Sequence, residues 1–308
     1  MTDHRFWAAH SPVTEPGPAA AVIDRLPPDL GALRAASQQL VFHYRAGGDY
    51  AENGIAPERV SEIDTRYAAL MFARLGELAD RPLSAARHPA ERLVGCCRDF
   101  TVLFVAMARH KGIPARARVG FAGYFAAGWL IDHVIAEVWD ESADRWRLVE
   151  PEIADLHADP ADGASFDPLD VPADRFLTGP RAWQLARSGA ADPERFVVDP
   201  GLEIPATRGW PQLRHNLVHD LAALNKAEML LWEDWGVLDS LTPPGPGELI
   251  MLDELAALTG QPSPPLADIR SAYRRPEFAV PDTVTTFSPA RTDVPATVDV
   301  SVVAQAAR

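Results

Sequence analysis

Hydrophobic residues recur at spacings of three and four over much of the first third of the chain, a pattern typical of amphipathic α-helices. It predicts helices over 28–44, 57–79 and 97–111. The last of these is expected to stop at Gly112, because Gly112 and Pro114 both disfavour the continuation of a helix. The apolar stripe of the second helix is the most regular and consists of Val60, Ile63, Tyr67, Leu70, Met71, Leu75 and Leu78.

Beyond residue 114 the hydrophobic period changes to two, which is the period of a half-buried β-strand. Apolar and polar residues alternate over 115–121, 133–139 and 146–150. We therefore predict three strands, followed by a loop-rich stretch up to about residue 179. Helical spacing returns at 181–188, 211–235, 246–258 and 265–274. Helices and strands in this order predict an α+β fold with one sizeable core.

The two ends of the chain differ in composition from the middle. Residues 1–27 are rich in Pro and Ala and predict an extended arm that drapes over the core. Residues 276–308 mix Pro, Thr, Ser and Val and predict an extended or disordered tail, with one edge strand at 297–303. Between them, 28–275 is expected to form a single domain whose last part, about 180–275, is a helical cap.

Composition and charge narrow the classes of partner. The chain has 308 residues, is 47% hydrophobic and carries a formal net charge of −14. An acidic surface repels phosphate backbones, so nucleic acid is not expected as a partner. No apolar run approaches the roughly 18 residues of a membrane span, and the polar, proline-interrupted N-terminus lacks the apolar core of a signal peptide. We expect a cytoplasmic protein without a membrane partner.

The two cysteines, Cys96 and Cys97, are adjacent in the chain. Neighbouring cysteines rarely pair with each other, so they do not indicate a disulfide framework. Both lie where the predicted helix over 97–111 begins. The positive end of a helix and a nearby imidazolium lower the pKa of a thiol, and the first backbone N–H groups of a helix are free to bind an oxyanion. Either cysteine is therefore a candidate nucleophile.

A histidine and a carboxylate occupy matching positions on two predicted strands. If 140–143 forms a hairpin loop, His133 lies directly opposite Glu150, with Cβ atoms about 5 Å apart. Glu150 would then bond one ring nitrogen and leave the other for a thiol, as in catalytic triads. Each residue taken alone usually has a structural role, but together they predict a thiol site. Asp132 is a weaker alternative partner, because it lies on the opposite face of the strand.

Two further histidines, His215 and His219, are one helical turn apart, which is a spacing that suits a metal ion. The sequence offers no third ligand near them. We therefore expect neither a metal nor another cofactor.

At these motifs the sequence resembles the transglutaminase-like superfamily, which is related to the papain-like cysteine enzymes. The pattern of that family is a Gly-x-Cys-x-Asp-Phe helix start, a Gly-Ile-Pro-Ala-Arg turn, a strand that begins with His, and a Trp-x-x-x-Asp-Pro strand end. The corresponding parts of this chain are 95–100, 112–116, His133 and 146–151.

The resemblance implies a core in which the nucleophile helix packs on an antiparallel sheet. It also implies Cys97 as the nucleophile, His133 as the base and acid, and Glu150 in the acid position, where the family usually has Asp. Cys96 is then a small packed side chain. The family often takes an oxyanion donor from a side chain upstream of the cysteine.

The candidates for that donor are Gln39 and His43. Beyond the core, the segment 214–236 is unusual for a solvated helix, because it combines charged and amide residues with tryptophans. It predicts either a helical cap that packs on the catalytic core or the wall of a substrate pocket. In the second case the residues that contact a small polar substrate are Arg214, Asn216 and Asp220.

These observations predict a cysteine-dependent acyltransferase or amide hydrolase, which forms or cleaves an amide bond through an acyl-thioester on Cys97. Its partners would be a peptide or a small acyl donor and, in a transfer reaction, an amine acceptor. One alternative is a cysteine protease or amidase that acts only by hydrolysis. The other is an inactive binding protein that retains the fold, and Glu150 in place of Asp is the feature that favours it.

Overall fold

The computed structural model describes residues 4–154, 159–160, 162–239 and 244–307. Its middle is a sheet in the order β5-β4-β3-β6, in which all neighbours are antiparallel. The strands are β3 (Ala115–Ala122), β4 (Leu130–Asp140), β5 (Arg145–Val149) and β6 (Phe176–Thr178), and the short β7 (Phe196–Val197) pairs in parallel with the start of β4. The prediction of a fold that mixes helices with an antiparallel sheet is confirmed.

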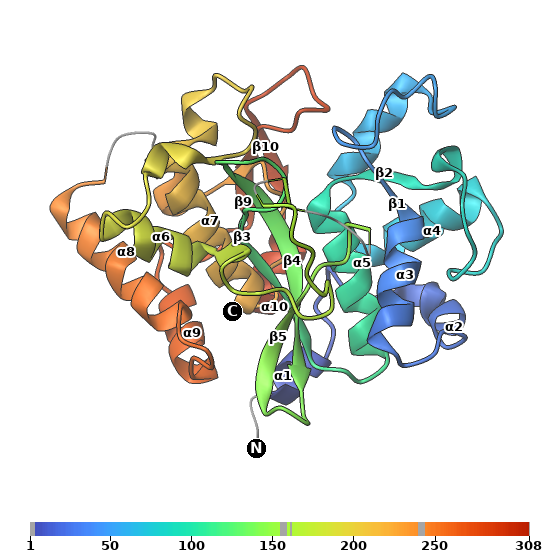
Figure 1. The fold of residues 1–308 in the computed structure, drawn as a ribbon, viewed down its shortest axis with the longest axis horizontal. Coiled ribbons are helices and arrows are strands. Elements are labelled where there is room, and N and C mark those ends of the chain that lie inside the picture. Colours follow the sequence, from blue (N-terminus) through green and yellow to red (C-terminus); the bar gives the residue numbers. More distant parts are fainter. Residues whose placement is uncertain (1–3, 155–158, 161, 240–243, 308) are drawn as a thin grey trace.

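Helices flank this sheet on both sides (Figure 1). One group comes from the first third of the chain and consists of α3 (Leu30–Leu40), α4 (Ala68–Leu78) and α5 (Cys97–His110). The other comes from the second half and consists of α6 (Gly179–Arg187), α7 (Gly209–Leu224), α8 (Pro246–Thr259) and α9 (Leu266–Tyr273).

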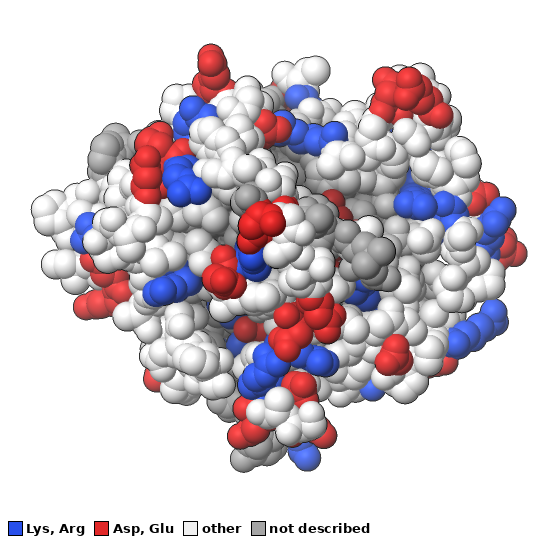
Figure 2. All heavy atoms as spheres, in the orientation of Figure 1, with Lys and Arg blue, Asp and Glu red and all other residues white. Residues whose placement is uncertain are grey.

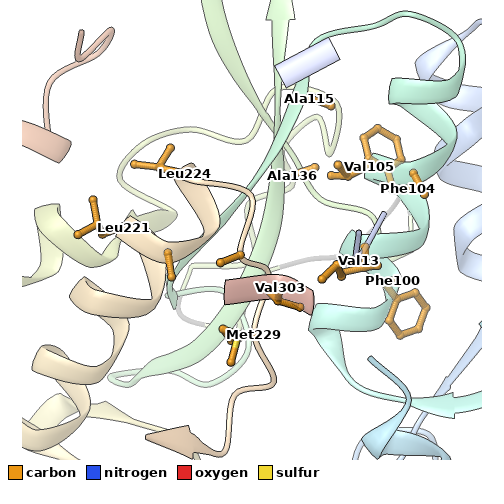
Figure 3. Close-up of a cluster of buried hydrophobic side chains, with 14 of the residues drawn as sticks. Val13, Phe100, Phe104, Val105, Ala115, Ala136, Leu221, Leu224, Met229 and Val303 are labelled. Atoms are coloured by element: carbon orange, nitrogen blue, oxygen red, sulfur yellow. The ribbon is translucent and has the colours of Figure 1, made fainter. Parts of the chain in front are cut away.

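Helix α5 is buried along nearly its whole length, which explains why its sequence is apolar on several faces. It packs against α3 and against the strands β3 and β4. Val105 of α5 and Ala136 of β4 belong to the same core of buried side chains (Figure 3). The helix stops before Gly112, whose φ of +76° is readily adopted by glycine, as the sequence predicts.

Two of the predicted helices are shorter than the hydrophobic pattern suggests. The first ends at Leu40, and the chain continues as strand β1 (Val41–His43), which pairs in parallel with β2 (Leu93–Gly95). The second is divided into a 3₁₀ helix, η2 (Pro57–Asp64), and α4. The extended residues between them allow Arg66 to reach a buried ion pair with Glu233, a tertiary contact that periodicity does not reveal.

The predicted helix over 211–235 also ends early. Helix α7 stops at Leu224, and Lys226 then adopts a φ of +65°. The chain continues to the short strand β8 (Glu233–Asp234), which pairs with β9 (Thr283–Thr286). A left-handed residue cannot continue a right-handed helix, so the helix ends here. The apolar spacing beyond 224 therefore reflects burial in the core rather than a continued helix.

The N-terminal residues differ from the extended arm that their composition predicts. They form α1 (His4–Ala8), the 3₁₀ turn η1 (Gly17–Ala19) and α2 (Ala20–Ile23). Trp7 is 2% exposed, and its indole N–H donates to the carbonyl of Leu224, 3.1 Å away. Local helices form here because burying side chains such as Trp7 and Ile23 outweighs the weak helical preference of the Pro-rich sequence.

The C-terminal residues are also more structured than predicted. Strand β9 lies between β8 and β10 (Ala296–Asp299), and α10 (Ser301–Ala307) follows. The expected edge strand at 297–303 is therefore correct only in its first part. The second part is helical because Val303 is buried in the core (Figure 3).

Helix α7 covers the edge of β3. The Asp220 carboxylate accepts the backbone N–H of Val119 at 2.9 Å and a pair of hydrogen bonds from the Arg118 guanidinium. The Asn216 side chain donates to the carbonyl of Gly120 at 2.8 Å. Strand β6 pairs with β3 only at Gly120–Ala122, so these side chains bond backbone groups of β3 at and beyond the end of that pairing.

Acidic and basic side chains are interspersed on the face shown in Figure 2, with no single-sign block across it. Within the ranges that the structure describes, no helix has the length and apolar character needed to cross a bilayer.

Candidate active site

Cys97 is the first residue of α5 and directly follows β2 and the N-cap residue Cys96. The Asp99 carboxylate accepts the backbone N–H of Cys96 at 2.8 Å, which fixes the turn that presents Cys97. Gly95 is required here, because a Cβ at this position would lie 2.7 Å from Asp99 Oδ2. The Gly-x-Cys-x-Asp pattern is therefore explained by this turn: Gly95 leaves room for the Asp99 carboxylate, which accepts the backbone N–H of Cys96.

The neighbouring Arg98 fastens this turn to the rest of the core. Its guanidinium donates to Asp99 Oδ1 at 2.9 Å and to the backbone carbonyls of Arg66, Glu228 and Met229. Because Arg98 is buried and each nitrogen of its guanidinium is bonded, the start of α5 is held by two other segments of the chain, at Arg66 and at 228–229.

His133 lies in β4, and its Nε2 is 2.7 Å from Oε2 of Glu150, which follows β5. The predicted register is wrong by two residues, however. Trp139 pairs with Trp146, so the hairpin loop comprises 141–144, with Asp144 at a φ of +51°. Side chains of Asp140 and Ser142 bond within this turn, and these local contacts keep Asp140 in the strand.

The observed register changes how His133 and Glu150 meet. If the pairing is continued by one residue, Glu150 stands opposite Ile135, and His133 is its diagonal neighbour on the same face. Diagonal neighbours are about 7–8 Å apart, with a somewhat shorter distance between their Cβ atoms, and long side chains can bridge this gap. The extra methylene of Glu150 relative to Asp therefore suits this geometry.

Two other groups hold the Glu150 carboxylate. The hydroxyl of Tyr124 donates to Oε2, and the backbone N–H of Glu152 donates to Oε1 at 2.9 Å. Both acceptor oxygens are thus occupied, which fixes the orientation of the carboxylate. The sequence analysis missed Tyr124, because it lies in the loop after β3 and no spacing rule connects it to Glu150.

Helix α3 supports this segment from the other side. Arg34 Nε donates to the carbonyl of Glu150 at 2.7 Å, and Ser37 Oγ donates to that of Pro151 at 3.2 Å. Arg34 and Gln38 both donate to the carbonyl of Ile153. The sequence contained a signal for this clamp, since Arg34 and Ser37 interrupt the apolar face of a predicted helix.

Aromatic rings surround the imidazole of His133. The Phe125 ring lies edge-on with its centroid 4.9 Å away, and the rings of Tyr124 and Phe176 are at 6.2 and 6.3 Å. His133 is 2% exposed. Such a dry environment strengthens the bond between the imidazole and Glu150, because electrostatic attraction is larger where water is excluded.

His133 and Glu150 shift each other's pKa in opposite directions. Burial lowers the pKa of His133, but the charge and hydrogen bond of Glu150 raise it, and the net result is a raised pKa. Burial raises the pKa of Glu150, but His133 and Tyr124 outweigh this effect and lower it. The Glu150 carboxylate therefore stabilises the imidazolium that forms when His133 accepts a proton.

The pKa of Cys97 moves in the direction opposite to the one that its helix position predicts. The hydrogen bond with Cys96, burial, and the nearby carboxylates of Glu152 and Asp132 raise it well above its ordinary value. The resting thiol is therefore protonated. The same two carboxylates also act on His133, so Cys97 and His133 share one electrostatic neighbourhood. Among the described residues, no hydrogen bond joins the Cys97 thiol to the His133 ring.

His43 lies at the end of β1, beside the segment that leads into Cys97, because the N–H of Tyr44 donates to the carbonyl of Gly95. Its Nδ1 accepts the backbone N–H groups of Arg45 and Ala46 at 3.2 and 3.0 Å. Burial and the charge of His133 lower the pKa of His43 to about 4. The ring is thus neutral and carries its proton on Nε2.

Gln39, the other upstream candidate, has structural partners. Its side-chain oxygen accepts the backbone N–H of Arg87 at 3.4 Å and the Arg92 guanidinium at 3.2 Å. These bonds join α3 to the segment before β2. Gln39 therefore serves a structural connection, whereas His43 lies beside the segment that leads into Cys97.

The three candidates on α7 make contacts that support the helical-cap interpretation. Asp220 and Asn216 bind the edge of β3, and Asn216 also donates to Asp132 Oδ1 at 2.8 Å. Arg214 forms an ion pair with Glu248 of α8 at 3.0 Å. Of the three, only Asn216 is connected to the histidine site, through the residue that precedes His133.

The stacked rings of His215 and His219 have centroids 4.0 Å apart. His219 Nε2 lies 2.9 Å from the carbonyl of Glu233, and His215 Nε2 lies 3.8 Å from Asp234. In the part of the chain that the structure describes, no three His, Cys, Asp or Glu side chains gather in a way that would hold a metal ion.

Comparison with known proteins gives a family match for one segment of the chain. Residues 59–151 match the family model of the transglutaminase-like superfamily, and the match includes Cys97, His133 and Glu150. This segment of the chain is similar to that superfamily, whose members generally carry out cysteine-dependent acyl transfer or hydrolysis. Searches of the curated proteins and of the solved structures found no match.

Proposed function

We propose that the protein is a cysteine-dependent enzyme that forms or cleaves an amide bond through an acyl-thioester on Cys97. The observation that carries this proposal is the buried bond between His133 Nε2 and the Glu150 carboxylate. A histidine that is oriented by a carboxylate is equipped to move a proton, and this bond leaves Nδ1 for that task. The family of the segment 59–151 points to the same chemistry.

In the proposed reaction, the Cys97 sulfur attacks the carbonyl carbon of an acyl donor. Because the resting thiol has a raised pKa, its proton passes to Nδ1 of His133 during the attack rather than before it. His133 then protonates the leaving group as the bond to the carbonyl carbon breaks. An amine or water takes the acyl group from the thioester and restores the Cys97 thiol.

The developing oxyanion needs hydrogen-bond donors. The backbone N–H of Cys97, at the start of α5, is one donor that a helix N-terminus supplies. We assign the second to Nε2 of His43, since its Nδ1 is occupied and the ring is neutral. A neutral imidazole donates a hydrogen bond without adding a second cation beside His133.

The first rival function is an inactive binding protein. Its basis was the replacement of Asp by Glu150, and the longer side chain reaches His133 at 2.7 Å from its diagonal position. Hydrolysis remains the alternative outcome for the same thioester, because the triad acts identically on water and on an amine.

The proposal is tested by intact-protein mass spectrometry after brief incubation with p-nitrophenyl acetate, a general activated acyl donor. We expect one acetyl group, mapped to Cys97 by peptide analysis. Cys97→Ala should lose it, whereas the matched variant Cys96→Ala should keep it. An adduct that survives in Cys97→Ala, or no adduct in the native protein, would refute the proposal.

The assignment of His43 is tested separately. His43→Ala should lower kcat by about 10²-fold, the loss typical of one oxyanion-hole donor, with little change in KM. Gln39→Ala is the control, because the contacts of Gln39 are structural. Equal turnover in the native protein and His43→Ala would assign the donor elsewhere.

A further inference from the structure

Lys226 is a lysine that the proposed reaction does not use, and it lies against an aromatic ring. It follows the end of α7, where its left-handed φ of +65° turns the chain. Its Nζ lies 4.2 Å from the centroid of the Phe6 ring in α1, and the side chain is half-buried. Packing against the ring removes part of the water that would solvate the ammonium, which favours the neutral amine.

The Lys226 ammonium lacks an acidic partner. Glu228 is two positions further along the chain, but its Oε1 accepts from Arg109 at 2.9 Å and its Oε2 accepts from Ser11 at 2.8 Å. Within the described residues, Lys226 Nζ forms neither an ion pair nor a hydrogen bond. The other lysine of the chain, Lys111, differs in this respect, because its Nζ donates to a backbone carbonyl at 3.1 Å.

Two arginines add positive charge around this lysine. The guanidinium carbon of Arg270, in α9, lies 5.6 Å from the centroid of the same Phe6 ring. Arg109, in α5, donates to the carbonyl of Trp7 at 3.2 Å, which places its guanidinium beside α1. An anion that approaches Lys226 therefore meets three cationic side chains from separate elements of the fold.

These surroundings also change the protonation of Lys226. Burial and the charges of Arg109 and Arg270 lower its pKa to about 8, although Glu228 opposes the shift. Near pH 7.5 such a lysine is partly neutral, whereas an ordinary lysine is almost entirely protonated. Only the neutral amine has the free electron pair that a nucleophile needs.

We propose that Lys226 is a site of covalent acylation by small anionic acyl donors of the acyl phosphate class. The arginines draw the phosphate group of the donor toward the amine, an attraction that a neutral donor does not experience. Cys97 takes no part in this modification, so the inference goes beyond the proposed function and does not depend on it.

The modification balances without a further reactant. The neutral Lys226 nitrogen forms a bond to the carbonyl carbon of the acyl phosphate. The bond between that carbon and the phosphate oxygen breaks, and inorganic phosphate leaves with the electron pair. The nitrogen then gives one proton to solvent, and the product is an uncharged amide on Lys226.

The test uses the native protein and acetyl phosphate at pH 7.5, with the acetylated fraction of each lysine followed over time by peptide mass spectrometry. Lys226 should be acetylated at least about tenfold faster than Lys111, because a larger fraction of its amine is neutral. Lys111 thus serves as the control within the same molecule. Acetylation of Lys111 as fast as that of Lys226, or no acetylation of Lys226, would overturn the inference.

Variants separate the donor class from simple exposure of the amine. The rate with acetyl phosphate is divided by the rate with N-hydroxysuccinimidyl acetate, a neutral donor. In Arg270→Gln this ratio at Lys226 should fall about threefold. In the control Arg274→Gln, which removes an exposed arginine next to α9, it should stay native. An unchanged ratio in Arg270→Gln would overturn the preference for anionic donors.

A last variant keeps this inference apart from the proposed function. Cys97→Ala should be acetylated at Lys226 as fast as the native protein. Loss of the Lys226 adduct in Cys97→Ala would mean that the acyl group arrives through Cys97, and it would overturn direct acylation.

Discussion

Two buried polar networks in this protein differ in how their charges are balanced. The arginine network consists of ion pairs between five arginines and five acids: Arg66–Glu233, Arg98–Asp99, Arg109–Glu228, Arg116–Glu137 and Arg118–Asp220. The histidine cluster consists of Asp132, His133, Glu150 and Glu152. In the first network each acid has a guanidinium partner, whereas in the second three carboxyl groups act on one imidazole.

The difference is widest between Glu137 and Glu152, although burial also raises the pKa of Asp99 and Asp220 in the arginine network. Burial raises the pKa of Glu137, but Arg116 and Arg118 outweigh it and lower the pKa. Burial raises the pKa of Glu152 to about 7, since no guanidinium offsets it there. A carboxylate that is always ionised suits a structural pair, and one that titrates near neutral pH suits proton transfer.

The largest expected effect is on turnover in the histidine cluster. Glu150→Gln removes the charge that raises the pKa of His133 and favours the wrong ring tautomer, so kcat should fall by about 10³–10⁴-fold. The far-ultraviolet circular dichroism spectrum should remain native. Steady-state kinetics with p-nitrophenyl acetate measures the loss. Turnover within a factor of two of the native rate would mean that the carboxylate does not orient His133.

In the arginine network the same kind of change should affect stability. Asp220→Ala leaves the Arg118 guanidinium without one of its two acids and the Val119 N–H without an acceptor, so we expect the free energy of unfolding to fall by about 3–5 kcal/mol. Urea denaturation followed by tryptophan fluorescence measures it. A loss below about 1 kcal/mol would show that the edge of β3 does not depend on this contact.

Glu152 should link stability to pH. Its folded pKa of about 7 exceeds the ordinary value of 4.5, so between these pH values the folded protein retains a proton that the unfolded chain releases. Stability from this group is therefore lost as pH rises through the window, by about 3 kcal/mol in total. Glu152→Gln should remove that loss and be the more stable protein at pH 7.5.

Urea denaturation of both proteins at pH 4.5, 6 and 7.5 provides the measurement. Glu141→Gln serves as the control, because its side chain is exposed. If the free energy of unfolding depends on pH in the same way in Glu152→Gln and in the native protein, folding does not raise the pKa of Glu152.

The smallest effect concerns Tyr124. Tyr124→Phe removes one of the hydrogen bonds on Glu150 Oε2 while leaving the bond to His133, so kcat should fall by about tenfold. The pKa read from the acid limb of kcat/KM should also shift, since an undivided Oε2 binds His133 more strongly and holds its proton to higher pH. An unaltered acid limb would limit Tyr124 to a packing role.

The sequence allowed the elements around the site to be predicted well, and their pairing less well. Helix α5 begins and ends within one residue of its predicted limits, because Gly95, Asp99 and Gly112 act locally on the backbone. The register of β4 and β5 was wrong by two residues, since alternation is unchanged when a strand slips by two. Turn contacts of Asp140 decided between registers that the hydrophobic pattern cannot distinguish.

Other errors share a tertiary origin. Trp7 buries a Pro-rich N-terminal segment as short helices, and Arg66 interrupts a regular apolar stripe to reach Glu233. Both contacts join residues that are more than 150 positions apart, so no local window contains the information.

By itself, the sequence determined the positions of helix α5 and of strands β3, β4 and β5, the place of Cys97 at a helix start, and the residue types that chemistry requires, because these depend on short-range spacing and backbone preference. Only the tertiary structure decided which oxygen of Glu150 faces His133, that Tyr124 and helix α3 hold it there, and that the Cys97 thiol rests protonated. Those properties depend on burial and on charges brought together from distant segments, which local spacing does not encode.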